Sequence, residues 1–260
     1  MNKWIQYSID YANQRSYLDD LFRVYPTIPD GLREIDVEKW GKVEEAFHTQ
    51  DNKLLINSLL DLDLFPLKDS YVAYLRRDKS SIDRNPNTVN RICGRLYELG
   101  LDKLYEHCSQ PKETNRQIGP MFKDWIRTKA LGISPVGIDE FAHSTGNAIL
   151  DASDEVMAHF ASEHLNYHHA KGLDLLARFN GKYVIGEAKF LTDFGGHQNA
   201  QYNDAISTIE TPDVNAVKIA VLDGVLYIKG NNKMYRDLTQ THADYNIMSA
   251  LVLRDFLYQL

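Results

Sequence analysis

Three charged residues lie where an apolar strand pattern ends. Residues 183–190 read YVIGEAKF, and the alternation of side chains along a strand puts Glu187 and Lys189 on one face. Residues 173–179 form a shorter apolar run with Asp174 near its start. An Asn-Gly pair separates the two runs and is typical of a two-residue hairpin turn. Pairing through this turn places Asp174 opposite Glu187.

This arrangement favours metal-assisted hydrolysis of a phosphodiester. Two carboxylates on adjacent strands can share a divalent cation, and oxygen ligands without cysteine favour a hard ion such as Mg²⁺. Such an ion polarises the phosphate, lowers the pKa of a bound water and stabilises the leaving oxygen. Lys189 would position or deprotonate the nucleophile. The alternative is an exposed Glu187–Lys189 ion pair on an edge strand, which contributes little to stability.

The elements that must position these residues lie in the second half of the chain. Helical spacing dominates the first hundred residues. Strand-like runs follow at residues 173–179, 183–190, 216–222 and 225–228, among helices near residues 122–128, 153–165 and 245–260. Asp223-Gly224 predicts a second hairpin. We expect an α/β or α+β fold, in which helices flank a mixed β-sheet and the N-terminal region is helical.

The polar segment 109–116 is the expected linker between two domains. The predicted domains are residues 1–110, a helical region for DNA recognition or dimerisation, and residues 111–260, a catalytic domain.

Composition excludes several classes of protein. Two cysteines are too few for a disulfide framework or a thiolate zinc site. No stretch approaches the roughly 18 apolar residues of a membrane span, and the polar first twenty residues are unlike a signal peptide. We therefore expect a cytoplasmic protein without a membrane partner. The net charge of −7 argues mildly against nucleic acid, but residues 76–95 hold six basic residues against two acidic ones.

A short helix is expected over residues 85–100, with Pro86 in its first turn and Gly100 at its end. Its polar side chains and position suit readout of the DNA major groove, and an ordinary solvated helix is the alternative. The candidate DNA-binding residues here are Arg84, Asn87, Thr88, Asn90, Arg91 and Arg95.

The strand motif resembles that of the PD-(D/E)xK nuclease superfamily, with Asp174 matching the aspartate and Glu187-Ala188-Lys189 matching the (D/E)xK. The proline that usually precedes the aspartate is replaced here by Leu173. The resemblance implies catalytic roles for Asp174, Glu187 and Lys189. It implies metal ligation by the two carboxylates and the backbone carbonyl of Ala188. It also suggests a glutamate from the preceding helix, for which Glu155 is the candidate and Asp154 and Glu163 are competitors.

The resemblance continues after the catalytic strand. Gly195-Gly196-His197-Gln198 opens a helix, and Gln198 with Tyr202 looks like a Gln-x3-Tyr element found in some of these nucleases. His197, Gln198 and Gln201 are therefore further candidates for contacting DNA. Residues 85–100 and 114–125 also look like segments of type II restriction endonucleases. The neighbouring histidines, among them His164 and His168, lack the glutamate of a zinc-protease motif and are expected to be solvent-exposed.

Taken with this resemblance, the sequence predicts a prokaryotic type II restriction endonuclease that cuts double-stranded DNA at a short specific site. Mg²⁺ is the expected cofactor, Mn²⁺ should substitute, and Ca²⁺ should support binding only. A homodimer is expected because most such sites are palindromic. A cognate DNA methyltransferase is expected in the same system. The alternatives are a structure-specific repair or recombination nuclease of the same superfamily and a non-catalytic DNA-binding regulator.

Overall fold

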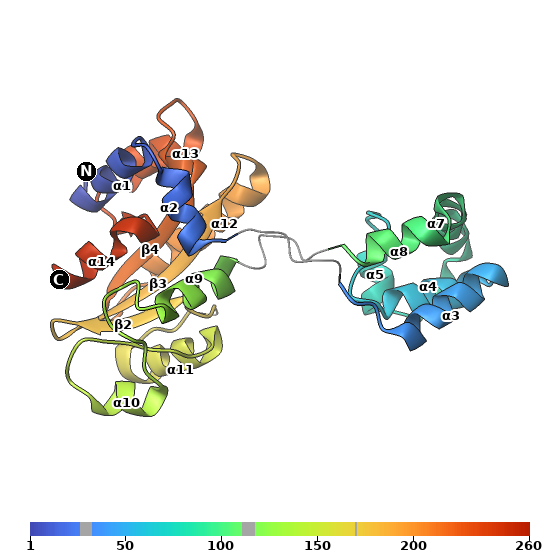
Figure 1. The fold of residues 1–260 in the computed structure, drawn as a ribbon, viewed down its shortest axis with the longest axis horizontal. Coiled ribbons are helices and arrows are strands. Elements are labelled where there is room, and N and C mark those ends of the chain that lie inside the picture. The colour runs from blue at the N-terminus through green and yellow to red at the C-terminus, as the bar shows by residue number, and fades with distance from the viewer. Residues whose placement is uncertain (27–32, 111–117, 170) are drawn as a thin grey trace. The chain divides into compact units, whose positions relative to one another are not determined.

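The computed structural model describes residues 1–26, 33–110, 118–169 and 171–260. The chain divides into two compact units, which Figure 1 shows. Met1–Thr27 and Thr114–Leu260 form the first, here called the sheet unit, and Ile28–Glu113 form the second, the helical unit. The predicted linker at residues 109–116 lies outside the described residues beyond Gln110.

Residues 1–26, which the prediction placed in the helical region 1–110, group by their contacts with the sheet unit. Trp4, Ile5 and Ile9 of α1 are buried in the core that covers the sheet. Helical periodicity reveals that a helix has an apolar face, but not which partner that face packs against. The assignment of the first helices to a separate helical region therefore had no support beyond their position in the chain.

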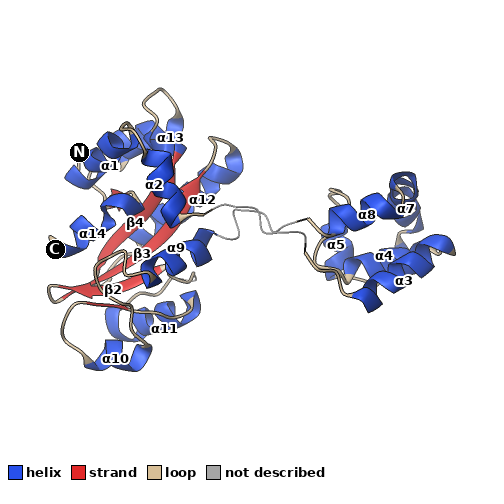
Figure 2. Ribbon diagram, in the orientation of Figure 1, coloured by secondary structure: helices blue, strands red, loops and turns tan. Residues whose placement is uncertain are grey.

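The sheet unit is built on five strands, and Figure 2 shows the longer ones in red between the helices. The strand order is β1-β2-β3-β4-β5, with β1–β2 and β2–β3 antiparallel and β3–β4 and β4–β5 parallel. The strands are β1 (Ala148–Ile149), β2 (Leu175–Phe179), β3 (Lys182–Leu191), β4 (Val217–Gly224) and β5 (Ile247–Met248). A mixed sheet flanked by helices, with a helical N-terminal region, confirms the predicted α+β class.

The hairpin between β2 and β3 has the predicted register. Leu175 pairs with Gly186, which is the alignment expected for a two-residue loop. Asn180 and Gly181 have φ angles of 49° and 77°, so both adopt the left-handed conformation that a type I′ turn requires. Asp174 lies one residue before β2, and its backbone N–H donates to the carbonyl of Gly186 at 3.1 Å.

The second predicted hairpin is wrong. β4 continues through Asp223-Gly224, and residues Val225–Tyr227 form a short 3₁₀ helix, η2, instead of a strand. The reason is that β3 and β5 already pair with the two edges of β4, so no edge remains for a hairpin partner. The expected helix over residues 245–260 is also shorter, because Ile247–Met248 form β5 and Ser249 caps α14 at its own start.

Helices cover both faces of the sheet. The alternation along β3 separates two cores: Val184 and Ala188 face the larger one and Ile185 faces the smaller one. Helices α1, α2, α9, α12 and α14 contribute to the larger core, and α10 and α11 to the smaller one. The helices of this unit are α1 (Lys3–Ala12), α2 (Tyr17–Val24), α9 (Ile118–Arg127), α10 (Ile138–His143), α11 (Asp154–Leu165), α12 (Gly196–Glu210), α13 (Lys233–Arg236), the π-helical turn η3 (Asp237–Thr241) and α14 (Ala250–Tyr258).

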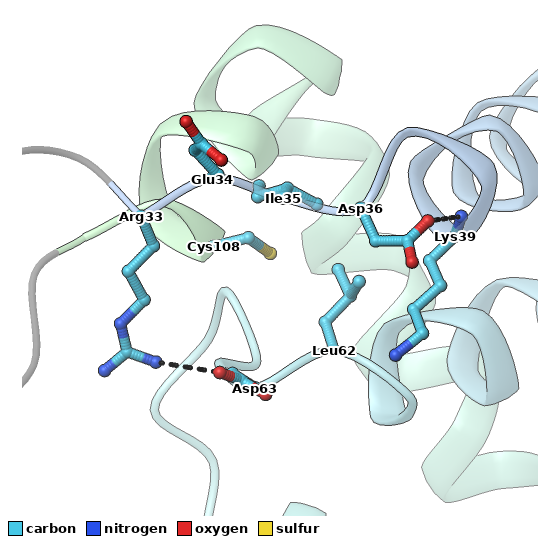
Figure 3. Close-up of a pocket in the computed structure, with 8 residues that line it drawn as sticks. All are labelled: Arg33, Glu34, Ile35, Asp36, Lys39, Leu62, Asp63 and Cys108. Carbon is cyan, nitrogen blue, oxygen red and sulfur yellow. Dashed lines mark hydrogen bonds and ion pairs between the residues drawn. The ribbon is translucent and has the colours of Figure 1, made fainter.

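The helical unit has a core of its own, formed by residues such as Leu55, Ile92 and Leu96. Its two ends are tied together, because the backbone N–H of Arg33 donates to the carbonyl of Ser109 at 2.8 Å. Figure 3 shows a pocket of about 120 Å³ beside this point, where Arg33 forms an ion pair with Asp63 at 3.8 Å. The helices are α3 (Val37–His48), α4 (Asn52–Leu60), α5 (Val72–Arg77), α6 (Ser81–Arg84), α7 (Pro86–Leu99) and α8 (Leu101–Cys108).

Over the described ranges, none of the helices is long and apolar enough to cross a bilayer.

Candidate active site

The structure brings Asp174, Glu187 and Lys189 together at the open end of the β2–β3 hairpin, away from the Asn180-Gly181 turn. The Lys189 Nζ lies 3.5 Å from the Asp174 Oδ2 and forms a hydrogen-bonded ion pair with the Glu187 Oε1. The backbone N–H of Ala188 donates to the Asp174 Oδ2 at 2.8 Å. One ammonium group therefore bridges two carboxylates, and the strand backbone fixes one of them.

The position of these residues follows from the strand pattern. Glu187 and Lys189 lie on the same face of β3 as the buried Ile185, whereas Ala188 anchors the strand in the core on the opposite face. Asp174 is 7% exposed and Glu187 is 9% exposed. Because β3 is paired along both edges, these residues do not form the exposed edge-strand ion pair that was the alternative interpretation.

Burial dominates the electrostatics of this cluster. Burial, and then the charge of Asp174, raise the pKa of Glu187 to about 7, although Lys189 partly opposes the shift. For Lys189, burial disfavours the ammonium, but Asp174 and Glu187 together outweigh this effect and raise its pKa above the usual value. The two carboxylates thus hold more negative charge than one ammonium offsets.

The residue before Asp174 explains a departure from the usual motif. Leu173 is fully buried, and its backbone N–H donates to the carbonyl of Asp154 at 3.2 Å. A proline at this position has no N–H and would lose this bond. Gly172 is required for the same approach, since an added Cβ would lie 2.5 Å from the Cβ of Asp154.

The predicted third carboxylate is not brought into a metal-binding group. Glu155 is exposed in the first turn of α11, and its neighbour Asp154 pairs with Lys123. Within the part of the chain that the structure describes, no group of three or more His, Cys, Asp and Glu side chains is placed to hold a metal ion. His164 and His168 are exposed, as expected. The candidate ligands that remain are Asp174, Glu187 and the Ala188 carbonyl.

A cleft of about 330 Å³ opens beside Lys189. Its lining includes His197 and Gln201 of α12, so two of the candidate DNA-contacting residues share this cleft with the lysine. Ile118 and Asp204 also line it, and sequence reasoning missed both. The spacing of residues 197, 201 and 204 follows one helical face, which is the signal that could have identified Asp204.

A family model described as Tsp45I type II restriction enzyme matches residues 2–260. The chain belongs to the Tsp45I type II restriction enzyme family. It is therefore a restriction endonuclease, a site-specific deoxyribonuclease of a restriction system that binds double-stranded DNA. Neither the curated proteins nor the solved structures contain a match to the chain.

In this restriction enzyme Gln198 faces the interior. It is 6% exposed, its Oε1 accepts from the backbone N–H of Thr192 at 3.2 Å, and its Nε2 donates to the Thr192 hydroxyl at 3.2 Å. Gln198 thereby holds the segment that follows β3. Its predicted contact with DNA stays a prediction.

The other candidate DNA-binding residues lie in the helical unit. Arg84, Arg91 and Arg95 are exposed and pair with Asp78 at 2.6 Å, Asp69 at 2.6 Å and Glu98 at 3.5 Å, respectively. Asn87 and Asn90 are exposed, Thr88 is half-buried, and the Asn90 Oδ1 accepts from the Asn52 side chain at 2.8 Å. These residues belong to a different compact unit from the carboxylate–lysine cluster.

Proposed function

We propose that this restriction enzyme is a Mg²⁺-dependent nuclease of the PD-(D/E)xK superfamily, with Asp174, Glu187 and Lys189 as its catalytic residues. The observation that carries the proposal is the buried pair of carboxylates bridged by the Lys189 ammonium. A purely structural cluster at this depth would be expected to balance its charges, whereas this one has an excess of negative charge.

The donor set fits a hard divalent cation. Asp174 and Glu187 supply carboxylate oxygens, and the raised pKa of Glu187 reflects a repulsion that added positive charge would relieve. Ala188 turns its N–H toward Asp174, and the N–H and C=O of one strand residue point to the same edge, so its carbonyl is a candidate third ligand. A bound Mg²⁺ would supply Lewis-acid polarisation of the phosphate and a more acidic water.

Lys189 is suited to control a proton. Its ammonium is stabilised by the two carboxylates against the effect of burial. If a bound cation offset those carboxylate charges, burial would be the main remaining effect on Lys189 and would lower its pKa, which would favour a role as a proton acceptor. In that state its Nζ can accept a proton from, or orient, a water held in the adjoining cleft.

The assembly and the biological setting belong to the same proposal. Two copies related by a two-fold axis would each cut one strand of a palindromic site. A methyltransferase that modifies the same site would protect the host DNA, as expected for a prokaryotic cytoplasmic enzyme. The match to a restriction enzyme family supports these proposals over a repair nuclease or a regulator without catalytic activity.

Digestion of a plasmid of known sequence tests the function. The wild-type enzyme should yield discrete fragments with Mg²⁺ or Mn²⁺, and Ca²⁺ should support specific binding without cleavage. Asp174→Asn should remove cleavage and retain binding in Ca²⁺, whereas Asp139→Asn, at an exposed position in the first turn of α10, should cut normally. Discrete fragments formed in the presence of EDTA, or cleavage of flaps and ends alone, would contradict the proposal.

A further inference from the structure

Two tyrosines stand out on the surface of the helical unit. Tyr71 and Tyr74 are 60% and 61% exposed, although the residues that follow them, Val72 and Leu75, are buried in the core. Tyr71 precedes α5 directly, and the spacing of Tyr71, Tyr74 and Arg77 places the three side chains along one helical face. Large aromatic side chains exposed side by side are characteristic of binding surfaces.

Each tyrosine has an arginine from a later helix beside it. The Arg91 guanidinium lies 5.6 Å from the centre of the Tyr71 ring. Asp78, and more weakly Tyr74, raise the pKa of Arg84, which reflects the closeness of the phenol to that guanidinium. Helices α5, α6 and α7 therefore contribute to one surface of alternating aromatic and cationic groups, although they are separate in the sequence.

Charge within the helical unit is unevenly distributed along the chain. Residues 68–95, which form this surface, hold seven basic and three acidic residues. Residues 34–66, which contain α3 and α4, hold three basic and eight acidic ones. The positive charge needed to meet a polyanion is thus concentrated around α5 to α7, in a protein whose overall charge is −7.

We propose that Tyr71, Tyr74, Arg77, Arg84 and Arg91 form a tyrosine–arginine surface that binds the phosphate backbone of double-stranded DNA. This inference rests on the proposed function and adds to it the place where the helical unit contacts the substrate. Tyrosine hydroxyls donate to phosphate oxygens, and the rings pack against the sugars. Such contacts fix the position of a protein on the duplex and leave base reading to other residues.

The aspartates beside the arginines serve as exchangeable partners. Arg91 pairs with Asp69 and Arg84 with Asp78, both at 2.6 Å, and both arginines are at least half exposed. Exposed ion pairs contribute little free energy, so a phosphate can replace the aspartate at small cost. Until then the aspartates hold the guanidinium groups near the tyrosine rings.

The test measures binding of the full-length enzyme to its cleavable duplex in Ca²⁺ at several salt concentrations. One variant is Tyr71→Ala/Tyr74→Ala and another is Arg77→Ala/Arg84→Ala. Lys42→Ala/Lys103→Ala, on exposed positions of α3 and α8, is the matched control. Thermal unfolding of each variant verifies that the helical unit remains folded.

The tyrosine variant should bind about tenfold more weakly or worse, which corresponds to about 1.4 kcal/mol, because it loses two hydroxyl donors to phosphate oxygens and the packing of two rings against the sugars. The arginine variant should bind more weakly and reduce the slope of log affinity against log salt by about one for each lost phosphate contact. The control should keep the affinity and slope of the wild type.

Affinities within twofold of wild type for both variants would overturn the proposal. It would equally be overturned if the variants lost a dimer in sedimentation while each remaining dimer bound DNA normally, because the surface would then join two copies. Cleavage separates this inference from the proposed function. Full activity of a Glu187→Ala variant would refute the catalytic site but not the tyrosine–arginine surface. Wild-type DNA binding by both surface variants would refute that surface but not the catalytic site.

Discussion

The two units differ in whether they bury charged side chains. In the sheet unit, Asp174, Glu187 and Asp223 are all less than 10% exposed, and they are held by a lysine, by backbone N–H groups or by hydroxyls. In the helical unit, ion pairs such as Lys79–Asp61 have both side chains at least half exposed. Burial of a charged group is unfavourable in free energy unless the group is paired, whereas an exposed charge remains solvated. A buried charge therefore indicates a specific role, and an exposed ion pair does not.

Each buried charged residue needs its own structural or catalytic explanation, whereas exposed charged residues act together through the charge of a surface. Asp223 shows that burial alone does not identify a catalytic group. It accepts hydrogen bonds from the hydroxyls of Tyr25 and Ser249 and from the Ala250 N–H, and burial raises its pKa to about 6. These bonds join α2 and α14 to β4, which is a structural role. Glu187 differs because its nearest charged neighbours are Asp174 and Lys189, and a cleft adjoins that lysine.

Removal of the lysine should give the largest effect. Lys189→Ala should lower the single-turnover rate of DNA cleavage by roughly 10²–10⁴-fold, the range for loss of a general acid–base group. Lys182→Ala, at the exposed start of the same strand, should cut at the wild-type rate. Rapid-quench assays with Mg²⁺ give both rates. If Lys189→Ala cleaves within twofold of the wild-type rate, the buried lysine has no catalytic role.

The pH dependence of stability should show that the folded protein disfavours the charged form of Glu187. Its pKa is about 7 in the folded protein against 4.5 ordinarily, so the folded state binds more protons between these values. The free energy of unfolding should therefore fall as pH rises from 4.5 to 7, by roughly 2–3 kcal/mol at about 1.4 kcal/mol per pKa unit.

Glu187→Gln should lose this part of the pH dependence, as measured by urea unfolding in EDTA at pH 4.5, 6 and 8. Adding Mg²⁺ at pH 8 should raise the unfolding midpoint of the wild type and leave that of Glu187→Gln nearly unchanged. Equal pH dependence in the two proteins would mean that Glu187 carries no excess charge.

A smaller effect compares two tyrosine hydroxyls, one in each unit. The Tyr25 hydroxyl donates to the buried Asp223 at 3.0 Å, and the Tyr97 hydroxyl donates to Asn52 at 2.9 Å in a half-buried setting. Tyr25→Phe should lower the free energy of unfolding by about 1–2 kcal/mol, because a buried carboxylate loses a partner. Tyr97→Phe should cost less, since water can replace the bond. Urea unfolding measures both, and an equal cost would contradict the contrast between the units.

The local part of the fold was predictable from the sequence. The Asn-Gly turn fixes the register of the β2–β3 hairpin, and that register brings Asp174 to Glu187 and Lys189. The helix expected near residues 153–165 is α11, and the Ser153 side chain fixes its start by accepting from the Val156 N–H. In each case the deciding interactions connect residues close together in the chain.

The features that were missed depend on contacts between distant segments. The packing of α1 on the sheet involves residues more than 200 positions apart. The pairing of both edges of β4 involves strands that are joined by a crossover. The hydrogen bonds between Gln198 and Thr192 could not be foreseen, because a motif gives residue types without their orientation. Tyr71 and Tyr74 were overlooked because aromatic residues in a helical pattern are usually buried, and only the packed unit shows that they are not.

Cleavage and binding by Glu187→Ala provide the most direct test of the catalytic site. Wild type and variant would be compared on the same plasmid with Mg²⁺, and on the corresponding duplex with Ca²⁺. The predicted result is a cleavage rate at least 10²-fold below that of the wild type, in line with the loss of a group that holds a catalytic metal, with binding in Ca²⁺ retained. If Glu187→Ala cuts the plasmid at the wild-type rate, Asp174, Glu187 and Lys189 are not the catalytic site.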